Sequence, residues 1–350
     1  MFKSQVLKFL SAVLFLLLAV GTMISAAAQD MPRLGHPPQN PDQGDESTET
    51  LKVNVNVVQL FFNVKDKKGG LISNLNKDDF EVLEDGKPQT VKYFTAESNL
   101  PLTLGILIDT SGSQARVLDM EKQVGGEFLR EILREKDLAF VIDFDVNVEL
   151  IQDFTNNIRS LQNAMNDTRI NTGGGSGAGI PGMGGGPIPT SNPRGTLLYD
   201  AIYLAGHDEL SHEVGRKAMI ILTDGEDQGS QLKIQDAIEA AQKSDSIVYV
   251  LLCADRGFYG MGGGFGYSGD REMKKITFET GGRVIEVGNK FEKLKEAFDQ
   301  ISKELRSQYN IGYTPTNQRR DGTYRKVQIK TKENYKVQAR AGYYAISGGD

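Results

Sequence analysis

The sequence predicts an α/β fold: a doubly wound, mostly parallel six-stranded sheet with helices on both faces. Between residues 101 and 306, short apolar runs bounded by turn residues alternate with segments of helical spacing. Such runs are typical of strands buried on both faces of a parallel sheet. Two of the runs, Asp137–Phe144 and Val148–Phe154, are joined too briefly for a helical crossover, so this pair should be antiparallel.

The individual elements follow from that alternation. The predicted strands are Thr103–Asp109, Asp137–Phe144, Val148–Phe154, Lys217–Thr223, Ser246–Cys253 and Arg283–Val287. The predicted helices lie near residues 116–134, 156–167, 196–211, 232–244, 271–280 and 291–306. The last helix carries apolar residues at helical spacing from Phe291 to Leu305.

Oxygen-bearing side chains follow two of these strands directly. Asp109, Ser111 and Ser113 come at alternate positions after the first strand, Asp224 follows the fourth, and Thr196 stands at the start of the helix before it. Sites in open α/β sheets form outside the carboxyl ends of the strands, so these residues converge if the two strands are neighbours. Oxygen ligands suit a hard cation, and this hydroxyl-rich set favours Mg²⁺ or Mn²⁺ over Ca²⁺.

A simpler interpretation of the same residues is helix capping. Asp and Ser after a strand often serve only as N-caps of the next helix, and Thr196 alone is an ordinary helix-start residue. The D-x-S-x-S segment by itself favours capping. The three segments together, each between a strand and a helix, favour a metal site.

The combination of D-x-S-x-S, a later Thr and a strand-terminal T-D-G resembles the metal-ion-dependent adhesion site of von Willebrand factor type A domains. The resemblance implies a Rossmann-like fold with Mg²⁺ at its switch point, and an Asp or Glu carboxylate of a protein partner completing the metal shell. Chemistry assigns direct ligation to Ser111 and Ser113, and direct or water-mediated ligation to Thr196. Asp109 and Asp224 balance the charge, at least one of them through water.

The regions that flank residues 101–306 predict β structure. Residues 51–98 and 308–346 contain short alternating runs and turn signals, and we expect them to form one small β-sandwich from both ends of the chain. The segments Phe62–Gly69, Asp79–Gln89 and Leu305–Pro315 resemble the acidobacterial type of von Willebrand factor A-related proteins. That resemblance supports architecture more than activity.

The N-terminal residues predict export. Lys3 and Lys8 precede the apolar run Phe9–Val20, and Ala26-Ala27-Ala28 offers a cleavage site, so residues 1–28 read as a signal peptide. An uncleaved anchor is the alternative, although the run is short for a membrane-spanning helix. Residues 29–50 are polar and Pro-containing, which predicts a disordered leader. We expect a periplasmic, cell-surface or secreted protein with no transmembrane segment after cleavage.

Composition narrows the remaining classes. The formal net charge of the 350 residues is -6, which gives no support for a nucleic-acid partner. Cys253, the single cysteine, lies in an apolar run and excludes an internal disulfide. Two Gly-rich segments, 173–189 and 257–269, are expected near the predicted site, and the aromatic residues of the second make it the better contact surface.

Three functions compete on this sequence. The first is a non-enzymatic, metal-dependent protein-binding module of the adhesion type. The second is a structural or assembly protein of the cell envelope. The third is a hydrolase that uses the same metal to activate water, for which Glu226 and Asp227 are the candidate bases. A solvated loop is the favoured interpretation of those two residues, so the binding module is the expected function.

Overall fold

The computed structural model describes residues 57–96, 100–171, 195–253 and 269–345. The predicted signal peptide (1–28), the leader (29–50) and the Gly-rich segments 173–189 and 257–268 lie outside the described residues. Within the described part, no helix is long and apolar enough to cross a membrane.

A six-stranded sheet forms the centre of the region that follows the first four strands. Its order is β10-β9-β8-β5-β6-β7, and its pairs are parallel except β6 with β7, which is antiparallel as the short connection predicts. Its strands are β5 (Leu102–Asp109), β6 (Leu138–Phe144), β7 (Val148–Thr155), β8 (Arg216–Thr223), β9 (Ser246–Leu252) and β10 (Val284–Glu286). Every residue of β5, β8 and β9 is buried, which explains their continuous apolar runs.

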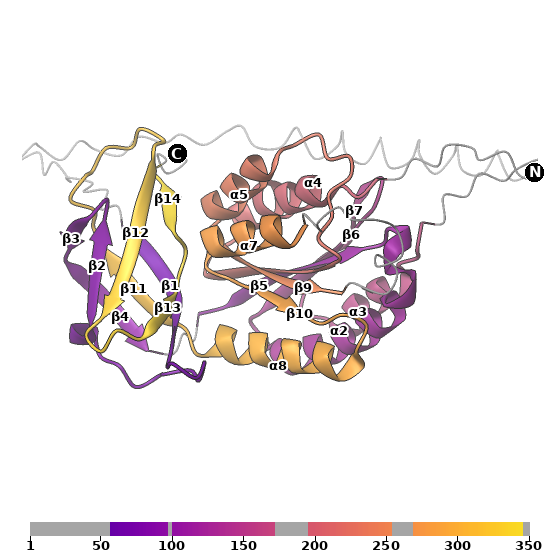
Figure 1. Cartoon of the computed structure of the whole chain (residues 1–350), viewed down its shortest axis with the longest axis horizontal. Helices are drawn as coiled ribbons and strands as arrows, with labels where there is room; N and C mark the ends of the chain where they lie inside the picture. The colour runs from indigo at the N-terminus through magenta and orange to yellow at the C-terminus, as the bar shows by residue number, and fades with distance from the viewer. Residues whose placement is uncertain (1–56, 97–99, 172–194, 254–268, 346–350) are drawn as a thin grey trace, which may run out of the picture. The chain divides into compact units, whose positions relative to one another are not determined.

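Helices cover both faces of this sheet (Figure 1). One face carries α2 (Leu118–Ile132), α3 (Ile158–Asp167) and α8 (Phe291–Arg306). The other carries α4 (Leu198–Tyr203), α5 (Ile234–Lys243) and α7 (Gly269–Thr280). Each face has its own apolar core, one centred on Phe128 and Phe298 and the other on Ile202 and Ile238. The sheet is therefore closed to water on both sides, and its edges are the places left for function.

The helix predicted over residues 196–211 is divided in the structure. The α-helix α4 passes into a π-helical segment, η3 (Leu204–Glu209), and then into a 3₁₀ turn, η4 (Leu210–His212). The division accompanies a close approach to α5, because a Cβ on Gly206 would lie 2.9 Å from the carbonyl carbon of Ala240. Apolar spacing reports the helical face but not this tertiary contact.

Strands from both ends of the described chain interleave in two four-stranded sheets. The sheet order β13-β1-β11-β4 contains β1 (Val58–Lys65), β4 (Val91–Ala96), β11 (Tyr309–Tyr313) and β13 (Lys336–Gln338). The order β14-β12-β2-β3 contains β2 (Phe80–Glu84), β3 (Lys87–Gln89), β12 (Tyr324–Thr331) and β14 (Gly342–Tyr344). Apolar residues of both sheets, among them Phe62, Val82, Ile311 and Val327, share one core.

A buried polar network connects β2 with strands β11, β12 and β14 from the C-terminal part of the chain. The Glu84 carboxylate on β2 accepts hydrogen bonds from the hydroxyls of Tyr313 (2.9 Å) and Tyr343 (2.8 Å), and it pairs with Arg325 at 3.4 Å. All three donors come from the C-terminal strands or the segment that joins them. Because Glu84 and Arg325 are each 2% exposed, neither charge has water as a substitute partner.

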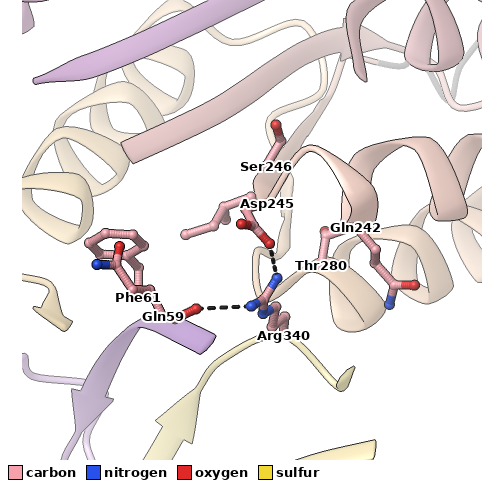
Figure 2. A pocket seen from close by; sticks show the side chains of 8 residues that line it. Gln59, Phe61, Gln242, Asp245, Ser246, Thr280 and Arg340 are labelled. Carbon is pink, nitrogen blue, oxygen red and sulfur yellow. Dashed lines mark hydrogen bonds and ion pairs between the residues drawn. The ribbon is translucent and has the colours of Figure 1, made fainter. Parts of the chain in front are cut away.

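The interleaved sheets also contact the central α/β region. The Arg340 guanidinium pairs with Asp245, which precedes β9, and donates to the Gln59 carbonyl on β1 at 2.9 Å (Figure 2). These residues border a cavity of only about 20 Å³, which is the scale of a single water molecule. The pocket in Figure 2 is therefore part of a packed junction and has no room for a larger ligand.

Candidate metal centre

Asp109 connects the ends of the two strands that the sequence singled out. Strands β5 and β8 are parallel neighbours with Ile108 opposite Leu222, so Asp109 and Thr223 end level with each other. The Asp109 side chain is fully buried; its Oδ1 accepts from the Ser111 N–H at 2.9 Å and its Oδ2 accepts from the Thr223 hydroxyl at 2.7 Å. These two hydrogen bonds hold the carboxylate at the ends of both strands.

The hydroxyls of Ser111 and Ser113 lie side by side and share a hydrogen bond of 3.0 Å. Neighbouring ligands of an octahedral Mg²⁺, each about 2.1 Å from the ion, lie about 3.0 Å apart. Neither serine caps α2, which begins at Leu118 after a 3₁₀ turn, η2 (Gly112–Arg116), and the Ser111 side chain does not cap that turn either. Ser111 stands at the N-cap position of η2, but neither serine hydroxyl makes a capping hydrogen bond to η2 or α2, and their spacing fits two ligands of one small ion.

Asp224 brings a second carboxylate to the same edge. It follows β8, is 3% exposed and accepts from the Glu226 N–H at 3.1 Å. Burial, together with the nearby Asp224 charge, raises the pKa of Asp109 to about 7, against the hydrogen bonds from Ser111 and Thr223. Two buried carboxyls that repel each other are a setting that a cation would relieve. The donor set therefore fits a small hard divalent ion.

Thr196 lies at the same edge but outside its predicted helical position. Its backbone exchanges two hydrogen bonds with Gln228 in the loop after β8, at 3.2 and 2.9 Å. The helix begins two residues later, at Leu198, and its Tyr199 N–H is accepted by Asp227 and Ser230 instead of by Thr196. The structure thus brings Thr196 beside the loop that carries Asp224. Its role as a ligand stays a prediction.

The structure adds residues that the sequence analysis did not select. Thr223 positions Asp109, and its hydroxyl also accepts from the Gly225 N–H at 3.0 Å. With its side-chain amide turned to satisfy both neighbours, buried Gln114 accepts from the Asp224 N–H at 3.1 Å and donates to the Cys253 carbonyl at 3.2 Å. The sequence signal for Thr223 was its position directly before Asp224. Nothing in the sequence indicated Gln114.

Glu121 is the least expected of these residues. It lies on the buried side of α2 with Leu118 and Phe128, at helical spacing that was visible in the sequence. Neither carboxylate oxygen has a full hydrogen-bond partner, since the neighbouring Cys253 thiol is a weak donor. Burial raises the pKa of Glu121 to about 8, and the charges of Asp109 and Asp224 act in the same direction. A third carboxyl group therefore lies behind the candidate centre.

The remaining reactive groups of this edge have structural partners. Asp227 accepts from Ser230 at 2.5 Å and from Tyr199, and Glu226 accepts from Gln228 at 2.8 Å. Cys253 is fully buried, and burial raises the pKa of its thiol well above the usual range. In the described residues, no group of three or more His, Cys, Asp and Glu side chains is placed to hold a metal, so a metal centre here depends on the hydroxyls.

Comparisons with known proteins give likeness of fold at low identity. No family model matches the chain, and no curated protein matches it. BatB from Bacteroides thetaiotaomicron is 20% identical with a TM-score of 0.41 over 59% of this chain and 100% of that one. The vWF domain of the type V pili tip protein Mfa5 from Porphyromonas gingivalis is 11% identical, with a TM-score of 0.42 over 59% and 96% of the two chains.

A third solved structure, proximal thread matrix protein 1 from the mussel byssus, is 12% identical with a TM-score of 0.45. That likeness covers 64% of this chain and 51% of the other. Membership of the von Willebrand factor A family therefore stays a prediction for this chain.

Proposed function

We propose that this chain is an exported protein-binding module of the von Willebrand factor A type, with Mg²⁺ at the carboxyl edge of its central sheet. The observation that carries the proposal is the 3.0 Å separation of the Ser111 and Ser113 hydroxyls in front of two buried carboxyl groups. Bound there, Mg²⁺ would supply a Lewis-acidic position that a partner's Asp or Glu carboxylate can fill.

The residues divide the work by their chemistry. Ser111 and Ser113 would hold the ion through neutral hydroxyls, and Thr196 would join them from the neighbouring loop. Asp109 is occupied on both oxygens by hydrogen bonds from Ser111 and Thr223, so it balances charge from behind. A shell with few direct carboxylates leaves the ion short of negative charge, which favours an acidic group on a partner.

The alternatives make different demands on this edge. A hydrolase needs a general base, yet Asp227 is engaged with Ser230 and the first turn of α4, and Glu226 with Gln228. An assembly protein would need a self-complementary surface in place of a metal at this edge. The binding module uses the groups that the edge does present, and it contains no catalytic step.

Isothermal titration with Mn²⁺, followed by competition with Mg²⁺, tests the metal site directly. The double variant Ser111→Ala/Ser113→Ala should lose at least about tenfold in affinity, because two direct ligands are removed. Ser73→Ala, an exposed serine in the loop after β1, is the matched control and should bind as the parent does. Equal Mn²⁺ affinity in the parent and the double variant would exclude this site.

The carboxylate part of the proposal needs its own measurement. Acetate added to the Mn²⁺-loaded parent should displace a coordinated water and change the water-proton relaxation rate. The same acetate concentration should change the relaxation rate much less in a protein-free solution that contains Mn²⁺ at the same concentration. A loaded protein that never responds to acetate or to a Glu-containing peptide would leave a structural metal site and refute the adhesion function.

A further inference from the structure

A basic groove lies on the side of the central sheet where its parallel strands begin, opposite the candidate metal centre. The strands of a parallel sheet all begin on one side of the sheet and all end on the opposite side. Asp109 is the last residue of β5 and Asp224 follows β8, whereas the groove includes Arg283 and Val284 at the start of β10. Its volume is about 960 Å³, and its walls come from β1, α7, α8, β13 and the turns beside them.

The groove is strongly positive in a chain whose net charge is negative. Seven basic and two acidic side chains line it, whereas the whole sequence has a formal charge of -6. Four of the basic side chains, Lys67, Lys68, Lys303 and Lys336, are exposed and form no ion pair within the described part of the chain. A concave surface of one sign concentrates ligands of the other sign.

The negative charge of Glu304, one of the two acidic side chains in the groove, is balanced by ion pairs within the chain. Glu304 on α8 is 3% exposed; its Oε1 accepts from Lys65 Nζ at 2.8 Å and from Arg283 Nε at 2.9 Å, and its Oε2 accepts from Gln338 at 3.1 Å. This network makes the base of the groove rigid. The four exposed lysines beside this network have no ion-pair partner among the described residues, so they are available to an acidic ligand.

Two sheet edges and one exposed aromatic ring complete the groove. In the described sheets, β13 and β10 are terminal strands, and residues of both line the groove. Terminal strands present backbone N–H and C=O groups to which an extended peptide can add. Phe278 on α7, whose side chain is 69% exposed, stands in the same lining as an apolar contact.

We infer that this groove binds an extended acidic peptide segment of a partner protein. The lysines pair with the Asp or Glu side chains, a sheet edge pairs with the peptide backbone, and Phe278 takes an apolar side chain. Because it lies at the opposite edge of the sheet, this surface is independent of the candidate metal centre. Binding there should continue in chelator and weaken with salt, since exposed charges are screened.

A labelled peptide of about ten residues that alternates Glu and Val tests the inference, because alternation places every carboxylate on one face of a strand. Fluorescence anisotropy at low salt and in EDTA should show saturable binding to the full chain. The same peptide with Lys in place of Glu should not bind. A version N-methylated at every residue keeps the charge but has no backbone N–H to donate to a sheet edge, and it should bind more weakly.

The decisive variant reverses three exposed lysines, Lys67→Glu, Lys68→Glu and Lys336→Glu. It should weaken binding by at least about tenfold, because each exposed ion pair contributes modestly and each reversed charge repels the peptide. The matched control, Lys92→Glu/Lys293→Glu/Lys295→Glu, reverses the same number of exposed charges on β4 and α8 away from the groove. The control should bind within about twofold of the parent if local charge decides. Coincident far-UV circular dichroism and melting curves establish that both variants fold.

Any of four results would overturn the inference. The first is no binding of the Glu–Val peptide at low salt, and the second is equal weakening by the two triple variants. The third is lysine-dependent binding to phosphatidylserine vesicles in place of the peptide, which would assign the groove to a membrane surface. The fourth is equal binding of the N-methylated peptide, which would show that no sheet edge pairs with the peptide backbone.

Discussion

Replacing Glu304 by Ala should destabilise the protein through the contact between the interleaved sheets and α8. The Glu304 carboxylate connects Lys65 on β1, Gln338 on β13 and Arg283 at the start of β10. The side chains of Lys65 and Glu304 are 11% and 4% exposed, whereas Arg283 is 28% exposed and reaches water. Without Glu304, Lys65 keeps a charge in a buried position with only Gln338 beside it.

The magnitude follows from that asymmetry. Breaking a buried ion pair on one side costs about 3–5 kcal/mol, and the partial exposure of Arg283 places this case near the lower end, at about 3 kcal/mol. Burial lowers the pKa of Lys65 even with Glu304 present, so its charge depends strongly on this partner. Calorimetric unfolding should show a clear drop in melting temperature, roughly 2–4 °C for each kcal/mol lost.

The dependence on pH has a defined sign. Burial works to raise the pKa of Glu304, but the charges and hydrogen bonds of Arg283 and Lys65 outweigh it and hold that pKa below its usual value of 4.5. The contribution of Glu304 to the free energy of unfolding is therefore complete above pH 4.5 and lost as the pH falls through the folded-state pKa. The difference between parent and variant should shrink accordingly in acid.

The controls isolate the ion pair. Glu296→Ala, an exposed position on the same helix, should change stability by less than about 0.5 kcal/mol. Lys65→Met in the Glu304→Ala background should cost much less than Lys65→Met alone, because the two positions act as a unit. A Glu304→Ala protein within about 0.5 kcal/mol of the parent at neutral pH would refute the reasoning.

Two further predictions concern other parts of the molecule. Glu121→Gln should stabilise the chain in EDTA, because the folded state raises the pKa of Glu121 from 4.5 to about 8. Between these two pH values the gain should grow by up to about 1.4 kcal/mol per pH unit. Melting curves from pH 5 to 8 that show a constant gain over the parent would contradict this, and Glu131→Gln on the exposed side of α2 is the control. A truncation after Arg306 removes the strands that pair with β1 and β2, so limited proteolysis should cleave residues 57–96 rapidly while the central sheet stays protected; equal protection of both regions would show that β1–β4 fold without β11–β14.

The central sheet was accessible from the sequence because its information is local. Strands β5, β8 and β9 are buried on both faces, so their apolar runs are continuous and their ends are marked by polar residues. Predicted and observed strand ends there differ by at most one residue. The start of α4 was misplaced because its first turn is capped from the loop after β8, by residues about thirty positions away in the sequence.

The candidate centre was accessible only in part, for the same physical reason. Asp109, Ser111 and Ser113 are neighbours in the chain, and a spacing pattern reveals them. The helical spacing places Glu121 with Leu118 and Phe128, but only the packing of α2 on the sheet brings it close to Asp109 and Asp224. The partners of Glu304 lie as far away as β1. The basic groove collects lysines from several elements, and only Lys67-Lys68 stand together in the sequence. Charge clusters of this kind arise from tertiary arrangement.

The interleaving of β1 between β11 and β13 has a consequence for biosynthesis. Strand β1 leaves the ribosome long before either of its neighbours exists, and during that time both of its hydrogen-bonding edges are open to other chains. Strands β1 and β4 therefore have none of their partner strands until β11 has been made, which leaves them the part of the chain most open to pairing with other chains.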